Sequence, residues 1–304
     1  MFKARGAMEQ RPFGNTGVWV SQLGLGAGEL GDRALPDGQA ADTLAAVLDA
    51  GMTLLDTARG YGESEARIGR FLGPRRKDVV LSTKVGYQVE GRRDWSYAAV
   101  ALGIDESLRR LQTDWLDIVH LHSCDLETLR RGEAIRALLD ARQAGKLRVA
   151  AYSGENEALA WAVASGHFQS FQCSVSLCDQ RALATLVPQI EAQGGGLLAK
   201  RPVANAPWRF DERPYGTYGE EYWYRWHTMA RTGDLDPRGL SWQELAVRFV
   251  AHLPGVPGAI IGLTQPAHAA ENAAYAARGP LPADHVAAIR AAFQQHDEDW
   301  LGLT

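Results

Sequence analysis

Short apolar runs alternate with longer amphipathic stretches along nearly the whole chain, and this alternation constrains the fold more than any other feature. The apolar runs have the length of buried strands, and the stretches between them have the length and periodicity of helices. A strand that is followed each time by a helix is typical of a parallel sheet. The eight expected strands are residues 22–26, 53–56, 79–83, 118–122, 147–152, 170–175, 196–200 and 259–261.

Each expected strand is followed by an expected helix, and several helices carry end signals. Gly51, Gly145 and Gly166 come just after helices, where a left-handed residue is favoured. Ser241 and Glu244 have the spacing of a capping box. Eight such units predict an α/β fold of the (β/α)₈ TIM-barrel type, preceded by a short N-terminal β-hairpin around residues 13–20. The expected helices are residues 38–50, 64–72, 97–111, 127–144, 156–165, 181–193, 242–252 and 266–277.

A doubly wound sheet is the alternative architecture, and it usually carries a glycine-rich phosphate turn after its first strand. The run LGLGAGELG at 23–31 contains four glycines, at positions 24, 26, 28 and 31. Their spacing differs from G-x-G-x-x-G, and no helix is expected directly after them. The barrel is therefore the favoured architecture.

The widest gap between expected elements, residues 201–240, is too aromatic for a linker between domains. We therefore expect a single domain over residues 1–304, with a long aromatic-rich loop after the seventh strand. Such a loop would lie at the catalytic face of a barrel and could contact the substrate. Alternatively, YWYRW at 222–226 is a short helix whose rings pack on the barrel. The aromatic residues are Trp208, Phe210, Tyr215, Tyr218, Tyr222, Trp223, Tyr224 and Trp226.

Charge and cysteine content limit the possible partners and location. The net charge of −4 gives no reason to expect nucleic acid or an anionic membrane as a partner. Residues 1–14 lack the apolar core of a signal peptide, and no apolar run could span a bilayer, so we expect a cytoplasmic protein. Three cysteines without a CxxC pair suggest neither a disulfide framework nor a zinc ribbon, and we expect them to be buried. The oligomeric state is not indicated.

Four polar residues lie at or just after the C-terminal ends of neighbouring strands and would meet at one rim of the barrel. They are Asp56, Tyr61, Lys84 and His122. Each alone could be structural, but together they suit the protonation of a carbonyl oxygen while hydride arrives at the carbon. A tyrosine ordinarily has a pKa of about 10. A neighbouring ammonium stabilises the phenolate, a carboxylate holds the ammonium in place, and an imidazole can orient the carbonyl.

The stretches DTARGYG followed by SE, STKVG, and DIVHLHSCD resemble the motifs of the aldo-keto reductase superfamily. The likeness extends from FGNTGVWVSQLGLG to AEN at 270–272. It implies a (β/α)₈ barrel that transfers hydride between NAD(P)H and an aldehyde or ketone, with a small-molecule carbonyl or alcohol as substrate and no metal. It also implies that Tyr61 is the general acid, that Lys84 activates it, that Asp56 pairs with Lys84, and that His122 orients the substrate.

The resemblance also implies contacts with the nicotinamide end of the cofactor. Ser153 and Gln172 match residues that hold the carboxamide, although Gly154 replaces an amide side chain of the family. Lys200 stands where the family often has an aromatic residue that stacks on the nicotinamide. Its stem could cover a ring and its charge could meet a phosphate. Arg201 is a second candidate for a phosphate.

A segment after the last strand matches the phosphate-binding segment of the family. It contributes the remaining expected cofactor residues, which are Gly262, Thr264, His268 and Asn272. Thr264 and His268 stand where the family usually has basic residues for the 2′-phosphate of NADP. Backbone N–H groups at the helix N-terminus could still bind a phosphate. We expect NADP(H), with NAD(H) as the alternative.

Three other functions stay open. Lys84 could form a Schiff base in an aldolase, although this leaves Tyr61 and Asp56 unexplained. His120 and His122 could bind a metal in a barrel hydrolase, although Asp56 is the only good further ligand. A cofactor-binding regulatory barrel would need none of the four residues at the rim. His120 itself, one layer deeper than His122, could support Lys84 or be a satisfied core histidine.

Overall fold

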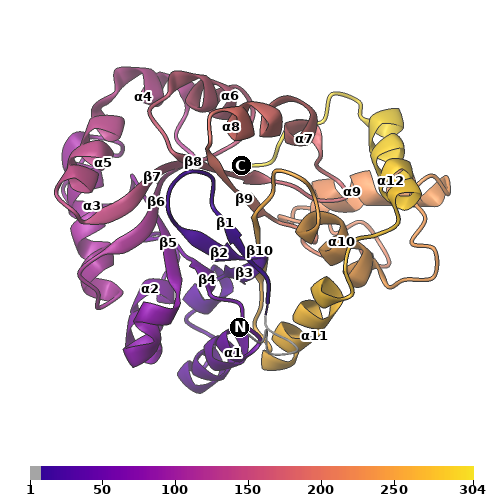
Figure 1. The fold of residues 1–304 in the computed structure, drawn as a ribbon, viewed down its shortest axis with the longest axis horizontal. Helices are drawn as coiled ribbons and strands as arrows, with labels where there is room; N and C mark the ends of the chain where they lie inside the picture. The colour runs from indigo at the N-terminus through magenta and orange to yellow at the C-terminus, as the bar shows by residue number, and fades with distance from the viewer. Residues whose placement is uncertain (1–7) are drawn as a thin grey trace.

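The computed structural model describes residues 8–304. At its centre lies a closed barrel of eight parallel strands, in which each strand pairs with the next along the chain and the last pairs with the first (Figure 1). This arrangement confirms the expected (β/α)₈ architecture. The strands are β3 (Leu23–Gly26), β4 (Leu54–Asp56), β5 (Val80–Val85), β6 (Leu116–His122), β7 (Leu147–Ser153), β8 (Ser170–Ser174), β9 (Gly196–Lys200) and β10 (Gly258–Gly262).

A short antiparallel hairpin precedes the barrel, as the sequence predicts. It consists of β1 (Gln10–Pro12) and β2 (Trp19–Ser21). Phe13, between these strands, is fully buried against Gly196, where an added Cβ would lie 2.8 Å from the ring. Gly196 is the first residue of β9, so the hairpin closes the N-terminal end of the barrel. Residues 1–7, part of the N-terminal segment considered above, lie outside the described residues.

Six of the expected helices are present with ends shifted by no more than a residue. They are α1 (Asp37–Asp49), α2 (Ser64–Leu72), α3 (Tyr97–Arg110), α6 (Asn156–Ser165), α10 (Trp242–Ala251) and α11 (Pro266–Ala277). The glycines expected after helices have φ values of +80° at Gly51, +77° at Gly145 and +70° at Gly166. The capping box at Ser241 is half formed. Its hydroxyl accepts from the Glu244 amide, but the Glu244 carboxylate pairs with Arg248 and Arg278 instead.

Two expected helices are each divided in the structure. Residues 127–144 form α4 (Leu126–Arg131) and α5 (Glu133–Gln143), because Gly132 between them has a φ of +75° that no helix accommodates. Residues 181–193 form α7 (Arg181–Thr185) and α8 (Val187–Ala192). Pro188 lies in the first turn of α8, where its missing N–H costs nothing, whereas it would break a continuous helix. The prediction of one continuous helix was therefore wrong at both places.

Further helices were not among the eight expected after the strands, although a short helix at 222–226 was one of the two alternatives for the aromatic loop. α9 (Glu220–Arg231) lies within the aromatic loop, and α12 (Ala283–His296) follows α11 near the C-terminus. The 3₁₀ helices are η1 (Glu29–Gly31), η2 (Gly73–Asp78) and η3 (Pro207–Arg209). Figure 1 shows α9 and α12 beside one another, outside the ring of helices that surrounds the barrel. The C-terminus lies close to β8 and β9 in the same view.

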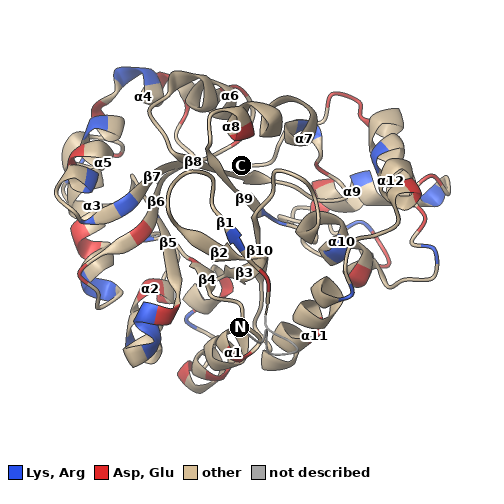
Figure 2. Ribbon diagram, in the orientation of Figure 1, with Lys and Arg blue, Asp and Glu red and all other residues tan. Residues whose placement is uncertain are grey.

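Buried residues and charged residues are distributed as expected for a barrel enclosed by helices. Both faces of the strands are buried, which is why they read as continuous apolar runs. Lys and Arg lie interspersed with Asp and Glu on outer helices such as α2 and α3 (Figure 2). The three cysteines are all buried, as expected. Among the described helices, none combines the length and apolar character needed to cross a membrane.

The 3₁₀ helix η1 packs directly on the turn that carries Tyr61, and this contact generates a test. A Cβ added at Gly31 would lie 2.1 Å from the Tyr61 carbonyl oxygen, so Gly31→Ala must displace backbone. We expect it to lower the free energy of unfolding by about 1–3 kcal/mol. Urea denaturation measures this change. The matched control is Gly38→Ala in α1, where nothing lies within 4 Å of an added Cβ and no loss is expected. Equal stabilities of the two variants would contradict the close contact.

Candidate active site

The four residues expected at one rim do meet there. The Lys84 Nζ lies 2.5 Å from the Asp56 Oδ2 and donates to the Thr57 carbonyl at 2.8 Å. The Lys84 and Asp56 side chains are only 3% and 2% exposed. The Lys84 Nζ is also 5.0 Å from the centre of the Tyr61 ring. The His122 ring stands edge-on to Tyr61, with 5.5 Å between the ring centres. The group therefore joins a phenol, an ammonium, a carboxylate and an imidazole.

Burial and charge decide the protonation states of Lys84 and His122. Burial alone would lower the pKa of Lys84, but the Asp56 carboxylate raises it above its usual value. Burial, together with the positive charges of Lys84 and Lys200, lowers the pKa of His122 to about 2. At neutral pH the site thus holds a charged lysine and a neutral histidine.

A network of hydrogen bonds lies directly beneath these residues. The Asp56 Oδ1 accepts from the Ser82 hydroxyl at 2.7 Å and from the Gln172 Nε2 at 3.0 Å. The Ser153 hydroxyl donates to the Gln172 Oε1 at 3.0 Å. Both oxygens of the buried carboxylate are thus occupied by donors, which is the condition for keeping a charge away from water. The network connects β4, β5, β7 and β8.

His120 is linked to the same carboxylate. Its Nε2 lies 3.1 Å from the Ser82 Oγ, and since that hydroxyl donates to Asp56, its oxygen accepts from His120. Burial lowers the pKa of His120 to about 4, so the ring is neutral. His120 also pairs with Lys84 in the register of β5 and β6. The structure thus places His120 next to the Lys84–Asp56 pair, through Ser82.

One cavity of about 1000 Å³ connects all the expected site residues. Its volume can hold a dinucleotide together with a small substrate. The cavity also contains Tyr87, which follows β5 and was not singled out from the sequence. The signal available was its position three residues after Lys84. The expected residues in the lining are Asp56, Tyr61, Lys84, His122, Ser153, Gln172, Lys200, Arg201, Gly262, Thr264, His268 and Asn272.

The end of the cavity near β10 is bounded by the turn before α11. The Thr264 carbonyl accepts from Gln39 and Thr43 of α1, which fixes the turn. The Asn272 Nδ2 donates to the His268 carbonyl at 2.7 Å. No Lys or Arg occurs in residues 262–272, and Glu271 lines the cavity beside His268. This end is therefore weakly charged.

The end of β9 is held by a second lysine–carboxylate pair. The Lys200 Nζ lies 3.0 Å from the Glu155 Oε1, which also accepts from the Ser174 amide and hydroxyl at 2.8 Å each. Burial lowers the pKa of Lys200, although Glu155 opposes this. Arg201 has a φ of +56° and donates to the Ser174 hydroxyl and to the Leu303 carbonyl. Both basic side chains are therefore fixed on the cavity wall.

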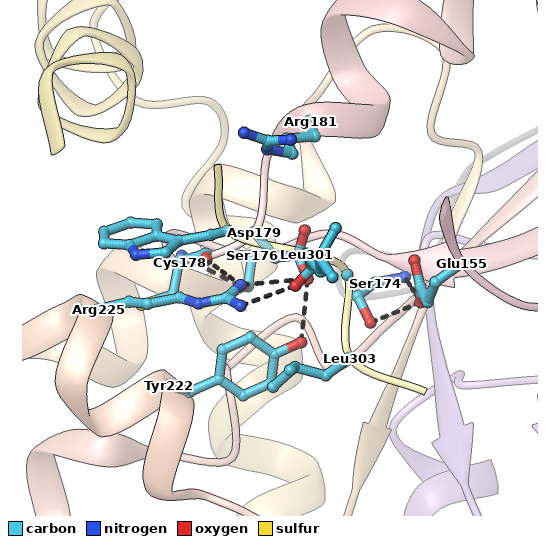
Figure 3. Close-up of polar contacts among 12 residues, drawn as sticks. Glu155, Ser174, Ser176, Cys178, Asp179, Arg181, Tyr222, Arg225, Leu301 and Leu303 are labelled. Atoms are coloured by element: carbon cyan, nitrogen blue, oxygen red, sulfur yellow. Dashed lines mark hydrogen bonds and ion pairs between the residues drawn. The ribbon is translucent and has the colours of Figure 1, made fainter. Parts of the chain in front are cut away.

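A buried polar cluster joins this wall to α9 and the C-terminal residues (Figure 3). The Arg225 guanidinium donates to the Leu301 carbonyl at 2.7 Å and to the Cys178 carbonyl at 3.4 Å. The Tyr222 hydroxyl donates to the Asp179 carboxylate at 3.2 Å. Burial and the nearby charge of Glu155 raise the pKa of Asp179 to about 7. The cluster holds residues 301–303 at the barrel mouth, where Thr304 lines the cavity.

The structure bears on both interpretations of the aromatic loop: part of it forms a packed helix, and part of it lines the cavity. YWYRW lies in α9, and Tyr222 is fully buried, which confirms the packed helix. Trp223 stacks on His227, with 4.5 Å between the ring centres. Phe210 and Tyr218, in contrast, line the cavity and provide an apolar wall. Within the described chain, no group of three or more His, Cys, Asp or Glu side chains could hold a metal ion.

Comparison with known proteins gives a consistent result. Residues 22–294 match the sequence profile described as the Aldo/keto reductase family. The chain is 28% identical over 291 residues to L-galactose dehydrogenase of Arabidopsis thaliana, covering 88% of each chain. It is 27% identical over 303 residues to D-threo-aldose 1-dehydrogenase of a Pseudomonas species, covering 86% of this chain and 91% of that protein. The holo form of an aldo-keto reductase from Bacillus halodurans superposes with a TM-score of 0.81 and 26% identity, over 94% of this chain and 96% of that one.

The hydrogen bond between His120 and Ser82 predicts the effect of removing the imidazole. We expect His120→Leu to fold, because leucine fills the buried volume without a polar group. Loss of the bond should slow carbonyl reduction about fivefold, since one neutral hydrogen bond contributes about 1 kcal/mol. Steady-state kinetics and urea denaturation measure the two effects. His120→Gln, which keeps an N–H donor, is the control and should lose less. Full activity of His120→Leu would show that His120 only fills the core.

Proposed function

Since the chain belongs to the aldo/keto reductase family, we propose that it transfers hydride between a nicotinamide cofactor and the carbonyl carbon of an aldehyde or ketone, in either direction. Family membership makes it an oxidoreductase. The observation that carries the assignment of residues is the buried Lys84–Asp56 pair beside the Tyr61 ring, with His122 edge-on to that ring. This grouping supports proton transfer to a carbonyl oxygen.

Tyr61 donates the proton, and the other three residues make this donation possible. As the proton leaves, negative charge develops on the phenol oxygen, and the Lys84 ammonium stabilises it. Asp56 keeps that ammonium charged and in place. His122, being neutral, can orient the substrate oxygen by a hydrogen bond without adding a third charge. In the direction of alcohol oxidation the same residues receive the proton.

The cavity residues fit a nicotinamide cofactor, which supplies or accepts the hydride when it is bound. Ser153 and Gln172 offer a hydroxyl and an amide for the carboxamide. Lys200 and Arg201 offer positive charge for phosphates, and both are fixed by Glu155 and its neighbours. Gly262, Thr264, His268 and Asn272 would enclose the far end of the dinucleotide. On the family resemblance, we propose NADP(H) as the cofactor.

The substrate is a small carbonyl compound or alcohol, and sugars are reasonable candidates. Two relatives are named as dehydrogenases of L-galactose and of D-threo-aldoses. In this chain, the apolar wall of Phe210 and Tyr218 stands beside the polar side chains of Arg209 and Thr217. Such a mixture suits a ligand with both hydroxyl groups and a carbon skeleton. Aldoses therefore belong in the substrate panel with simple aldehydes and ketones.

The Schiff-base alternative is not favoured by the environment of Lys84. An imine forms only from a neutral amine. Asp56 raises the pKa of Lys84, so the amine is protonated at neutral pH and its proton is held by the carboxylate. A stabilised ammonium suits the support of Tyr61 better than attack on a carbonyl.

Replacement of the Tyr61 hydroxyl tests the proposed general acid. We expect Tyr61→Phe to lower carbonyl reduction by about 10²- to 10⁴-fold, because no proton donor replaces the phenol. Cofactor affinity, measured by fluorescence titration, should stay nearly unchanged, since the ring is retained. Tyr97→Phe is the matched control, because that hydroxyl bonds to Asp140 on the outer helices. Activity of Tyr61→Phe within about tenfold of wild type would remove Tyr61 from this role.

Fluorescence titration with NADPH and NADH tests the cofactor. We expect both to bind and NADPH to bind more tightly, but by about tenfold or less. The reason for a small difference is that residues 262–272 contain no Lys or Arg to pair with a 2′-phosphate. His268→Gln should weaken the binding of NADPH and leave the binding of NADH unchanged. Tighter binding of NADH would contradict the NADP(H) assignment without affecting that of Tyr61.

A further inference from the structure

We infer that Tyr87 is a positioning residue for His122: its hydroxyl donates a hydrogen bond to the His122 Nδ1 and so fixes the tautomer that carries its proton on Nε2. The catalytic consequence rests on the proposed role of His122 in orienting the carbonyl oxygen. The tautomer itself does not depend on that role, and it can be observed without substrate or cofactor.

The contact between Tyr87 and His122 is direct. The Tyr87 Oη lies 2.9 Å from the His122 Nδ1, and the two ring centres are 5.2 Å apart. Tyr61 stands edge-on to the same imidazole. All three side chains line the cavity. His122 therefore contacts two tyrosines, of which Tyr87 is the one bonded to Nδ1.

Glycines and a tryptophan make room for the Tyr87 ring and hold it. A Cβ added at Gly60 would lie 3.0 Å from the Tyr87 hydroxyl oxygen, so the absence of a side chain there admits the phenol. Trp95 packs against Tyr87 with 5.6 Å between the ring centres. The Trp95 ring in turn occupies the space that a Cβ at Gly86 would fill, at 1.8 Å. The phenol is therefore held between Trp95 and His122.

The backbone of Tyr87 is fixed as well. The Arg59 Nη1 donates to the carbonyls of Tyr87 at 3.0 Å and of Gln88 at 2.9 Å. The Arg59 Nε donates to Glu106 of α3 at 2.6 Å. Arg59 is buried, so these bonds form away from competing water. The loop after β5 is thus tied to α3, and the Tyr87 hydroxyl has a defined position.

The direction of the hydrogen bond follows from the protonation states of the two groups. Burial and the positive charges of Lys84 and Lys200 keep His122 neutral by lowering its pKa to about 2, so the ring carries one proton on one of its nitrogens. Burial and the neighbouring Tyr61 raise the pKa of Tyr87, so its hydroxyl keeps its proton. A phenol is a better donor than a neutral imidazole N–H, and an imidazole nitrogen is a better acceptor than a phenol oxygen. In residues 8–304 the Tyr87 hydroxyl has no other hydrogen-bond partner.

This direction decides what His122 offers the substrate. With Nδ1 accepting from Tyr87, the proton resides on Nε2, and His122 can donate to the carbonyl oxygen that Tyr61 protonates. In the other tautomer, Nε2 would present a lone pair to that oxygen and repel it. By fixing this tautomer, Tyr87 makes the His122 Nε2–H a second donor, beside the Tyr61 hydroxyl, to the oxygen on which negative charge develops.

Nitrogen NMR of the histidines tests the tautomer. The full chain is labelled with ¹⁵N-histidine, and His122 is assigned by comparison with His122→Asn. We expect the wild type to carry its proton on Nε2, and Tyr87→Phe to show a mixture of tautomers. Tyr97→Phe is the matched control and should match the wild type. A wild-type proton on Nδ1 would overturn the inference, and this spectrum decides it even if Tyr87→Phe folds poorly. Unchanged tautomers in a folded Tyr87→Phe would overturn it as well.

Kinetics distinguish an action through His122 from direct contact with substrate. We expect Tyr87→Phe to lower kcat for carbonyl reduction about tenfold with little change in KM. In the His122→Ala background, the same substitution should change kcat by less than about twofold, because the positioned ring is gone. A full loss in that background would show that Tyr87 acts on the substrate itself, which contradicts the inference. Absence of reduction by the wild type would count against the proposed function, and the NMR result would still stand.

Discussion

The buried ion pair between Lys84 and Asp56 is the interaction on which the rest of the site depends. Removing two charges from water is costly, and their attraction offsets this cost only when the other polar atoms are also bonded. Asp56 ends β4 and Lys84 lies on β5, while the further donors to Asp56 are Ser82 on β5 and Gln172 on β8. Strands from different parts of the barrel must be in register to satisfy the pair. The closed barrel and the assembled site therefore depend on each other.

A second lysine–carboxylate pair repeats this arrangement on the other side of His122. Glu155 is more deeply buried than Lys200, and an added Cβ at Gly302 would lie 2.8 Å from its Oε2. The carboxylate is thus covered by the C-terminal residues, while the ammonium faces the cavity. Both lysines lower the pKa of His122. At this pair the cavity wall consequently presents the positive charge of Lys200 to a ligand and keeps the Glu155 carboxylate behind it.

The sequence was sufficient to locate the strand ends to within two residues. It thereby located the residues that line the cavity, because the C-terminal ends of parallel strands must meet at one rim. It could not reveal interactions that depend on distant segments. Arg225 in α9 contacts Leu301, which follows it by 76 residues, and no local pattern encodes that contact. A single glycine such as Gly132 is tolerated in many helices, so the break between α4 and α5 was missed. Tyr87 followed an expected strand, but its role depends on Trp95 and on the direction of one hydrogen bond.

The neutral state of His122 explains why so small an interaction as that with Tyr87 has consequences. A charged imidazole would donate from both nitrogens, and no partner would be needed to choose between them. Flanked by two ammonium groups, the ring is instead neutral, and its two tautomers are close in energy unless a neighbour distinguishes them. A hydrogen bond worth about 0.5–1.5 kcal/mol shifts their ratio by about twofold to tenfold, and by more where water is excluded. The same lysines that stabilise charge at the site therefore make the Tyr87 hydroxyl the group that decides which nitrogen can donate to substrate.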